Sequence, residues 1–192
     1  MKRLLLALAL AAPLQFASAA ERWDFDRAHT QVLFTVSHLG YTELTGQFRD
    51  VSGELMLDSE DLSKSSVTAR INAASIDMNF ERLEAHLKNK DFFDAENHAD
   101  MLFTSTRVEK VADDRLTVQG DLSLLGKSLP VSLDVRINKL GDHPMSGKPY
   151  GGFTATTSIK RSDWGMTYGV PNVGDEIGIR INLEAKPAPA AE

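Results

Sequence analysis

The stretch Glu176-Ile177-Gly178-Ile179-Arg180-Ile181-Asn182-Leu183-Glu184 decides the fold of this chain. Apolar and polar residues alternate along it, so the three isoleucines and Leu183 share one face of a strand. The same alternation recurs in Gln31–Val36 and in Leu116–Leu122. A chain built mostly of such strands must protect its sheet edges, and closure into a barrel removes them. A barrel of about eight strands is filled by side chains or holds one small ligand.

The predicted strands, nine in number, cover most of the chain, and Gly46 and Gly53 are expected to form bends or bulges within the third of them. They span residues 22–26, 30–38, 45–57, 65–72, 100–108, 115–124, 129–139, 152–161 and 176–185.

One predicted helix, at about residues 79–90, interrupts the strands. Asn79 is suited to the N-cap position, and Arg82 occupies the place where a capping box prefers an acid. Phe80, Leu83 and Leu87 recur at helical spacing and form an apolar stripe. A helix of this kind packs on the flank of a barrel or at one of its ends.

The first 19 residues have the pattern of a cleaved secretory signal peptide. Lys2 and Arg3 precede an apolar run at residues 4–12, and Ala17-Ser18-Ala19 forms a small-residue cleavage site. The apolar run is too short for a membrane anchor. We therefore predict export to the bacterial periplasm, one domain at residues 20–185, and a flexible tail at residues 186–192.

Charge and composition narrow the range of partners. The formal net charge is −6, and removal of the signal peptide takes away two positive charges and no negative ones. An acidic chain without basic clusters argues against nucleic acid and anionic lipid as partners. The apolar runs after Ala20 are too short for stable membrane insertion. The chain has no cysteine, which rules out disulfides and attachment of a lipid to cysteine.

A search for catalytic chemistry finds little. The chain has no cysteine nucleophile and no Gly-x-Ser-x-Gly elbow. Its five histidines form no close pair, and Asp91, Asp94 and His98 are better explained as turn and loop residues than as a metal site. We predict no enzyme activity, no cofactor and no metal.

The aromatic residues leave two interpretations open. They fill an ordinary core, or they line a tunnel for a ligand. Core packing is the default use of aromatic side chains. Alternation along the strands does not separate the two possibilities.

Several long motifs resemble the YceI-like family, in order and over essentially the whole mature chain. They are Ala28–Gly40, Leu87–Asp94, Gly120–Leu124, Gly152–Met166 and Tyr168–Glu176. The resemblance implies a lipocalin-like, extended antiparallel barrel of eight strands in the periplasm. It further implies a lumen for a polyisoprenoid or similar long-chain amphiphile, such as an isoprenoid quinone or a fatty amide. The family has no established enzymatic activity and has links to stress response.

This resemblance leads us to expect the following lumen residues: Phe34, Val36, Phe48, Phe80, Leu83, Leu87, Phe92, Phe93, Phe103, Leu122, Phe153, Trp164, Met166 and Tyr168. Polar residues at the mouth are expected to be His38, Arg161 and Asp163, with an Arg161–Asp163 ion pair in a turn as the alternative.

Two other functions remain open. One is an enzyme that modifies its bound lipid, with His38, Asp163 or Tyr168 as acid or base. The other is a stress-related binding protein whose core is packed shut. A homodimer through an exposed strand face is compatible with all three functions.

Overall fold

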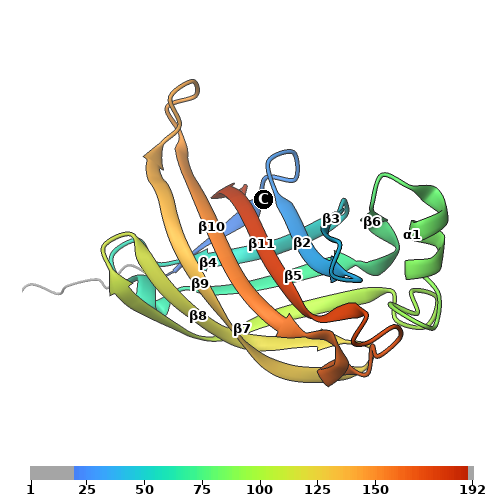
Figure 1. Ribbon diagram of the computed structural model, residues 1–192. Helices are drawn as coiled ribbons and strands as arrows, with labels where there is room; N and C mark the ends of the chain where they lie inside the picture. The colour runs from blue at the N-terminus through green and yellow to red at the C-terminus, as the bar shows by residue number, and fades with distance from the viewer. Residues whose placement is uncertain (1–19, 190–192) are drawn as a thin grey trace, which may run out of the picture.

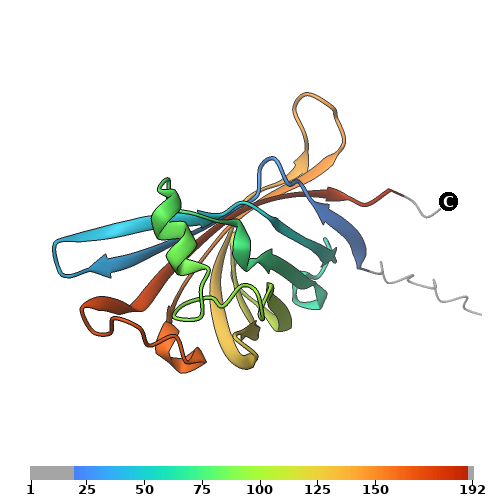
Figure 2. The ribbon, with the colours of Figure 1, turned by 90° about the vertical axis from the view of Figure 1, so that its right-hand side faces the viewer.

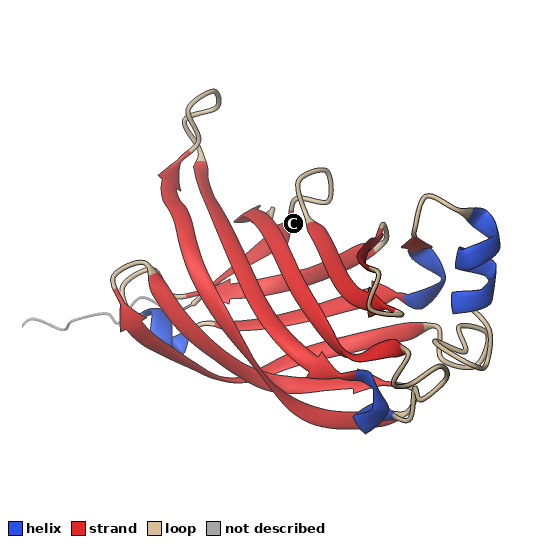
Figure 3. Cartoon of the chain, in the orientation of Figure 1, coloured by secondary structure: helices blue, strands red, loops and turns tan. Residues whose placement is uncertain are grey.

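The computed structural model describes residues 20–189 and shows a barrel of long, twisted strands with a helix at one end (Figure 1). The predicted signal peptide and residues 190–192 of the predicted tail lie outside the described residues. Strands dominate and the helical segments are short (Figure 3), so the all-β prediction is confirmed. None of the described helices is both long and apolar enough to cross a membrane.

The strands, in chain order, are β1 (Glu21–Phe25), β2 (Gln31–His38), β3 (Thr42–Phe48), β4 (Val51–Leu57), β5 (Ser66–Asn72), β6 (Ile76–Asp77), β7 (Asp100–Ala112), β8 (Arg115–Leu124), β9 (Lys127–Asp142), β10 (Pro149–Lys160) and β11 (Val173–Pro187). The helical segments are η1 (Leu62–Lys64), η2 (Ala73–Ser75), α1 (Glu81–Leu87) and η3 (Arg161–Trp164).

Eight of these strands close the barrel, in the order β1-β4-β5-β7-β8-β9-β10-β11, with β11 returning to β1. Every pairing around the ring is antiparallel. The predicted eight-stranded antiparallel barrel is therefore confirmed. Strands β2, β3 and β6 are additional and branch from β11.

Strand β11 changes partner along one edge. It pairs with β2 over Val173–Asn182 and then with β1 over Ala185–Pro187. Beyond the strand, the backbone N–H of Ala188 donates to the carbonyl of Arg22 at 2.8 Å. Lys186 and Pro187, at the start of the predicted tail, belong to β11 and pair with β1 to close the barrel.

The segment predicted as one long strand at residues 45–57 forms two strands. Strand β3 pairs with β2 and β6, whereas β4 pairs with β1 and β5. The chain turns at Arg49 and Asp50, where Asp50 accepts a backbone hydrogen bond from Asn72. Alternation of side chains carries no information about which strand each half pairs with.

Helix α1 is shorter than predicted. Its N-cap is Phe80, which has no capping side chain, and Asn79 has a left-handed φ of 56°. The Glu84 carboxylate instead accepts the backbone N–H groups of Met78 and Phe80, at 3.0 and 3.2 Å. The helix ends at Leu87, whose carbonyl accepts the N–H of Phe93. Viewed from this end, α1 lies across the barrel opening (Figure 2).

Three glycines face the barrel interior, and phenylalanine rings lie against them. A Cβ added at Gly46 would collide with the ring of Phe34, its cross-strand partner. At Gly53 and Gly120 it would lie 2.5 Å from ring atoms of Phe25 and Phe103. Gly46 and Gly53 are therefore not the bends or bulges predicted from the sequence. At all three glycines a phenylalanine ring approaches the backbone closely.

The ring contacts predict a cost for a single methyl group at Gly120. We expect Gly120→Ala to lower the free energy of unfolding by about 1–3 kcal/mol, because the new Cβ overpacks against the Phe103 ring and the Thr104 carbonyl. Urea denaturation measures the change. The matched control is Gly152→Ala, where the nearest atom to the added Cβ is 4.0 Å away. Equal stability of the two variants would contradict the close contact at Gly120.

Candidate functional site

The barrel encloses one continuous cavity of about 270 Å³. Its walls come from all eight barrel strands or their ends, from β2 and β3, and from the segment that follows α1. Leu116 and Leu124 of β8 both line it and lie about 26 Å apart along the strand. A volume of this size over such a length describes a narrow tunnel. Its shape suits an extended chain better than a compact ring system.

The lining is almost entirely apolar. Thr30, Ser65, Ser66 and Thr157 contribute hydroxyl groups, and Arg161 is the single charged residue on the lining formed by residues 20–189. No large side chain in the same part of the molecule is less than 2% exposed. This pattern is typical of side chains that border an internal space, and it argues against the closed-core alternative.

The structure brings ten of the fourteen expected lumen residues together on this lining: Phe34, Val36, Phe48, Leu87, Phe92, Phe93, Phe103, Leu122, Phe153 and Met166. Their contact with a ligand stays a prediction. The sequence interpretation missed other lining residues, among them Phe25 and the alternating side chains Ile177, Ile179, Ile181 and Leu183. The alternation in β11 was the signal for the last four.

Four expected lumen residues do not line the cavity, and they lie at the N-cap of α1, on α1, in η3 and in the loop after η3. Phe80 caps α1 and is 62% exposed, and Leu83 is half-buried on the same short helix. Trp164 is buried, but its indole N–H donates to the Leu122 carbonyl at 3.1 Å. Tyr168 is half exposed and packs on Phe92, with ring centroids 5.2 Å apart. Of the predicted apolar stripe of Phe80, Leu83 and Leu87, only Leu87 lines the cavity.

Two of the three expected mouth residues also lie off the lining. His38 is half-buried at the end of β2, and Asp163 is exposed in η3. The ion pair considered between Arg161 and Asp163 is not formed among the residues that the structure describes. The opposite charges of Arg161 and Asp163, two residues apart in the sequence, suggest an ion pair. In the structure Arg161 is buried, whereas Asp163 is exposed to solvent.

Arg161 itself is 3% exposed and holds the loop that follows η3. Its Nε donates to the carbonyl of Gly174 at 2.9 Å, and Nη1 donates to that of Met166 at 3.0 Å. Nη2 donates to the carbonyls of Tyr168 and Val173 at 2.9 and 3.0 Å. The guanidinium carbon lies 6.0 Å from the centre of the Phe92 ring. This side chain therefore joins the loop to the α1 end of the cavity.

Burial lowers the pKa of Arg161 from its ordinary value, and the charge of nearby Asp175 opposes that shift. Asp175 does not bond to the guanidinium. Its carboxylate accepts the backbone N–H and the hydroxyl of Ser162, at 2.9 and 2.7 Å. These hydrogen bonds are the main reason that its pKa is lowered. The buried arginine thus has an acid nearby but not in contact.

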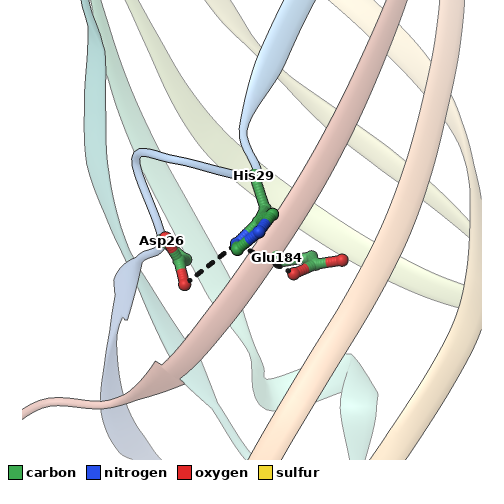
Figure 4. Close-up of side chains that lie close together, drawn as sticks. All are labelled: Asp26, His29 and Glu184. Atoms are coloured by element: carbon green, nitrogen blue, oxygen red, sulfur yellow. Dashed lines mark ion pairs between the residues drawn. The ribbon is translucent and has the colours of Figure 1, made fainter.

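A second polar cluster lies where β11 changes partner (Figure 4). The Nδ1 atom of His29 lies 3.3 Å from Asp26 Oδ2 and 3.5 Å from Glu184 Oε2. The Tyr150 hydroxyl lies 2.7 Å and 3.0 Å from the same two oxygens. The cluster links the turn after β1 to β10 and β11, so it stabilises the barrel where β11 pairs with β1.

The histidine and the two carboxylates of this cluster each offer one ligand atom, all within 4.8 Å of one another, and nitrogen and oxygen ligands of this kind suit a divalent metal. The hydrogen bonds to Tyr150 already explain the arrangement structurally. The sequence interpretation missed this cluster because Glu184 reaches the turn only through strand pairing. It considered Asp91, Asp94 and His98 instead, where the structure shows a turn in which Asp94 accepts the side-chain amide of Asn97 at 2.9 Å.

Comparison with known proteins gives a consistent picture. A family model described as a YceI-like domain matches residues 23–185. Protein YceI of Escherichia coli is 34% identical over 188 residues, covering 96% of this chain and 97% of that protein. The crystal structure of Burkholderia cenocepacia BcnA has a TM-score of 0.76 at 24% identity, over 85% of this chain and 100% of the other. A polyisoprenoid binding domain from Saccharophagus degradans, implicated in plant cell wall breakdown, has a TM-score of 0.64 at 13% identity, over 86% and 98% of the two chains. The two structural likenesses show a shared fold.

The cluster at the barrel closure predicts a pH dependence. The hydrogen bond from Tyr150 is the main reason that the pKa of Asp26 lies below its ordinary 3.8. The folded state therefore favours the carboxylate, and this stabilisation is complete above about pH 3.8 and lost as pH falls through the lower folded pKa. We expect Tyr150→Phe to lose about 1 kcal/mol of stability at neutral pH and less of it in acid.

Urea denaturation of both proteins from neutral to strongly acid pH measures this difference. Tyr41→Phe is the matched control, because Tyr41 is 89% exposed. If the wild-type protein and Tyr150→Phe lose stability in parallel as the pH falls, the Tyr150–Asp26 hydrogen bond does not set the pKa of Asp26.

Proposed function

Because this chain belongs to the YceI-like family, we propose that it is a binding protein that holds one polyisoprenoid or similar long-chain amphiphile in its barrel. The observation that carries the proposal is the narrow, apolar tunnel between the η1 end and the α1 end of the barrel. A family relationship alone does not assign a ligand. The shape and chemistry of the tunnel support a hydrocarbon chain.

The energetics of the tunnel favour a tail. Each methylene group removed from water contributes roughly 0.8 kcal/mol, so a long chain binds without polar recognition. The methionine side chains on the lining, Met101 and Met166, are flexible and adapt to tails of different shape. Selectivity among tails is therefore expected to be loose. The Saccharophagus degradans domain, which is described as polyisoprenoid binding, supports this ligand class by analogy of fold.

The proposed setting is the bacterial periplasm, where a lipid tail must be shielded from water between membranes. The pattern at residues 1–19 supports export. A role in stress response and the formation of a homodimer belong to the same proposal and stay predictions.

Binding is favoured over catalysis by the placement of the acid and base candidates. His38, Asp163 and Tyr168 lie off the cavity lining, so none of them faces the space that a bound tail would occupy. The proposal assigns no cofactor. An unchanged mass of the ligand after incubation with the protein is the expected result.

A bulky side chain in the tunnel tests the proposal. Ala155 is buried on the lining, and we expect Ala155→Phe to reduce the bound lipid at least about tenfold, since the new ring occupies the tunnel. Organic extraction of the purified protein, followed by mass spectrometry, measures the lipid. The wild-type protein is expected to yield a long-chain lipid at near one-to-one ratio.

The matched control is Thr156→Phe, which adds a ring at the next, exposed position of β10. It should keep the lipid content of the wild type. A wild-type protein that yields no lipid and takes up no fluorescent polyprenyl probe would overturn the proposed function.

A further inference from the structure

The cluster of Asp26, His29 and Glu184 lies outside the tunnel. Leu183 lines the tunnel and the next residue of β11, Glu184, does not, as alternation along a strand requires. The cluster instead borders an open groove of about 450 Å³, whose lining includes His29, Tyr150 and Glu184. An ion therefore reaches the cluster from solvent, whether or not a lipid occupies the tunnel.

Two carboxylates meet in this cluster, and only an imidazole lies opposite them. Among residues 20–189, the ion pairs of Asp26 and Glu184 involve His29 and no lysine or arginine. The backbone N–H of Asp26 donates to the carbonyl of Glu184 at 2.8 Å, which holds the two residues side by side. Like charges so close together repel each other, and a cation between them removes that repulsion.

The distances within the cluster match the coordination of a small transition-metal ion (Figure 4). A tetrahedral ion with ligands at about 2.0–2.2 Å separates neighbouring ligand atoms by about 3.3–3.6 Å. The Nδ1 atom of His29 lies 3.3 Å from Asp26 Oδ2 and 3.5 Å from Glu184 Oε2. All three ligand atoms lie within 4.8 Å of one another, and the Glu184 side chain is 42% exposed, so it has room to adjust. The Tyr150 hydroxyl, 2.7 and 3.0 Å from the same two oxygens, orients the carboxylates from outside the coordination shell.

We propose that His29, Asp26 and Glu184 form a site for one divalent transition-metal ion, with Zn²⁺ as the simplest case. One imidazole nitrogen and two carboxylate oxygens suit zinc, whereas Ca²⁺ and Mg²⁺ prefer shells made of oxygen alone. Three protein ligands leave a fourth position, which water reaches from the groove.

A metal ion in this position joins parts of the chain that are far apart in sequence. Asp26 and His29 belong to the turn after β1, and Glu184 lies where β11 passes from β2 to β1. An ion that binds only the folded barrel therefore stabilises its closure. The competing explanation is that the Nδ1 atom of His29 carries a proton and donates a hydrogen bond to a carboxylate, as the Tyr150 hydroxyl does. That explanation needs no metal.

Titration of the chelator-treated wild-type protein with Zn²⁺ separates these explanations. Calorimetry is expected to show one bound ion per chain, and zinc is expected to raise the midpoint temperature of unfolding as its concentration increases. A wild-type protein that binds no zinc overturns the site. Equal binding of Ca²⁺ or Mg²⁺ overturns the assignment to a transition metal. The lipid tunnel is tested by its own experiment, and neither result decides it.

Two variants assign the ion to the cluster. His29→Ala removes the nitrogen ligand, and Glu184→Gln removes one carboxylate at nearly constant side-chain size. Each should weaken zinc binding at least about tenfold, as the loss of a partner at a metal site does. His86→Ala is the matched control, because His86 faces one carboxylate, that of Asp91 at 3.6 Å, instead of two. It should keep the wild-type affinity.

Wild-type zinc affinity in both cluster variants overturns the site, even where the wild-type protein binds zinc. If His29→Ala does not fold, Glu184→Gln still decides, because it preserves the length of the side chain on β11.

Discussion

The contact between phenylalanine rings and inward-facing glycines is the constraint on which the hollow interior depends. Phe34 lies against Gly46, Phe25 against Gly53, and Phe103 against Gly120. Because each glycine lacks a side chain, the phenylalanine ring beside it packs flat against the barrel wall. A larger residue at the glycine position would push that ring toward the barrel axis. Protein interiors normally close up to crystal-like density. In this barrel large side chains cover the wall while a tunnel of about 270 Å³ remains between them.

A hollow barrel has fewer contacts across its interior, so interactions along its wall must stabilise the closed form. Strand β11 contributes such interactions by pairing with β10 along one edge and with β2 and then β1 along the other. At the point of change, the two carboxylates of the cluster share the Tyr150 hydroxyl and the His29 imidazole. Backbone pairing and this polar cluster therefore stabilise the closure together, where a filled core would otherwise contribute.

The period-two pattern was enough to predict an all-β barrel, because inward and outward residues alternate whatever the pairing. The choice of a lined tunnel over a filled core, and with it of lining residues such as Phe34, Phe103 and Phe153, came from the family resemblance. The pattern failed where position depends on pairing or on the direction of a short helix. Phe80 and Leu83 have helical spacing, yet α1 directs only Leu87 inward. Glu184 and His29 meet only through strand pairing, which no local pattern encodes.

The strands that form the tunnel wall and the loop at its α1 end are held in place by different interactions. The apolar wall contributes free energy in proportion to the tail length it covers, with little regard for the tail's identity. Arg161 donates to four backbone carbonyls, so the loop after η3 fixes the position of its side chain. The same four bonds join this loop to the α1 end of the tunnel. Movement of this loop would therefore change the α1 end of the tunnel while the strands still enclosed the rest of it.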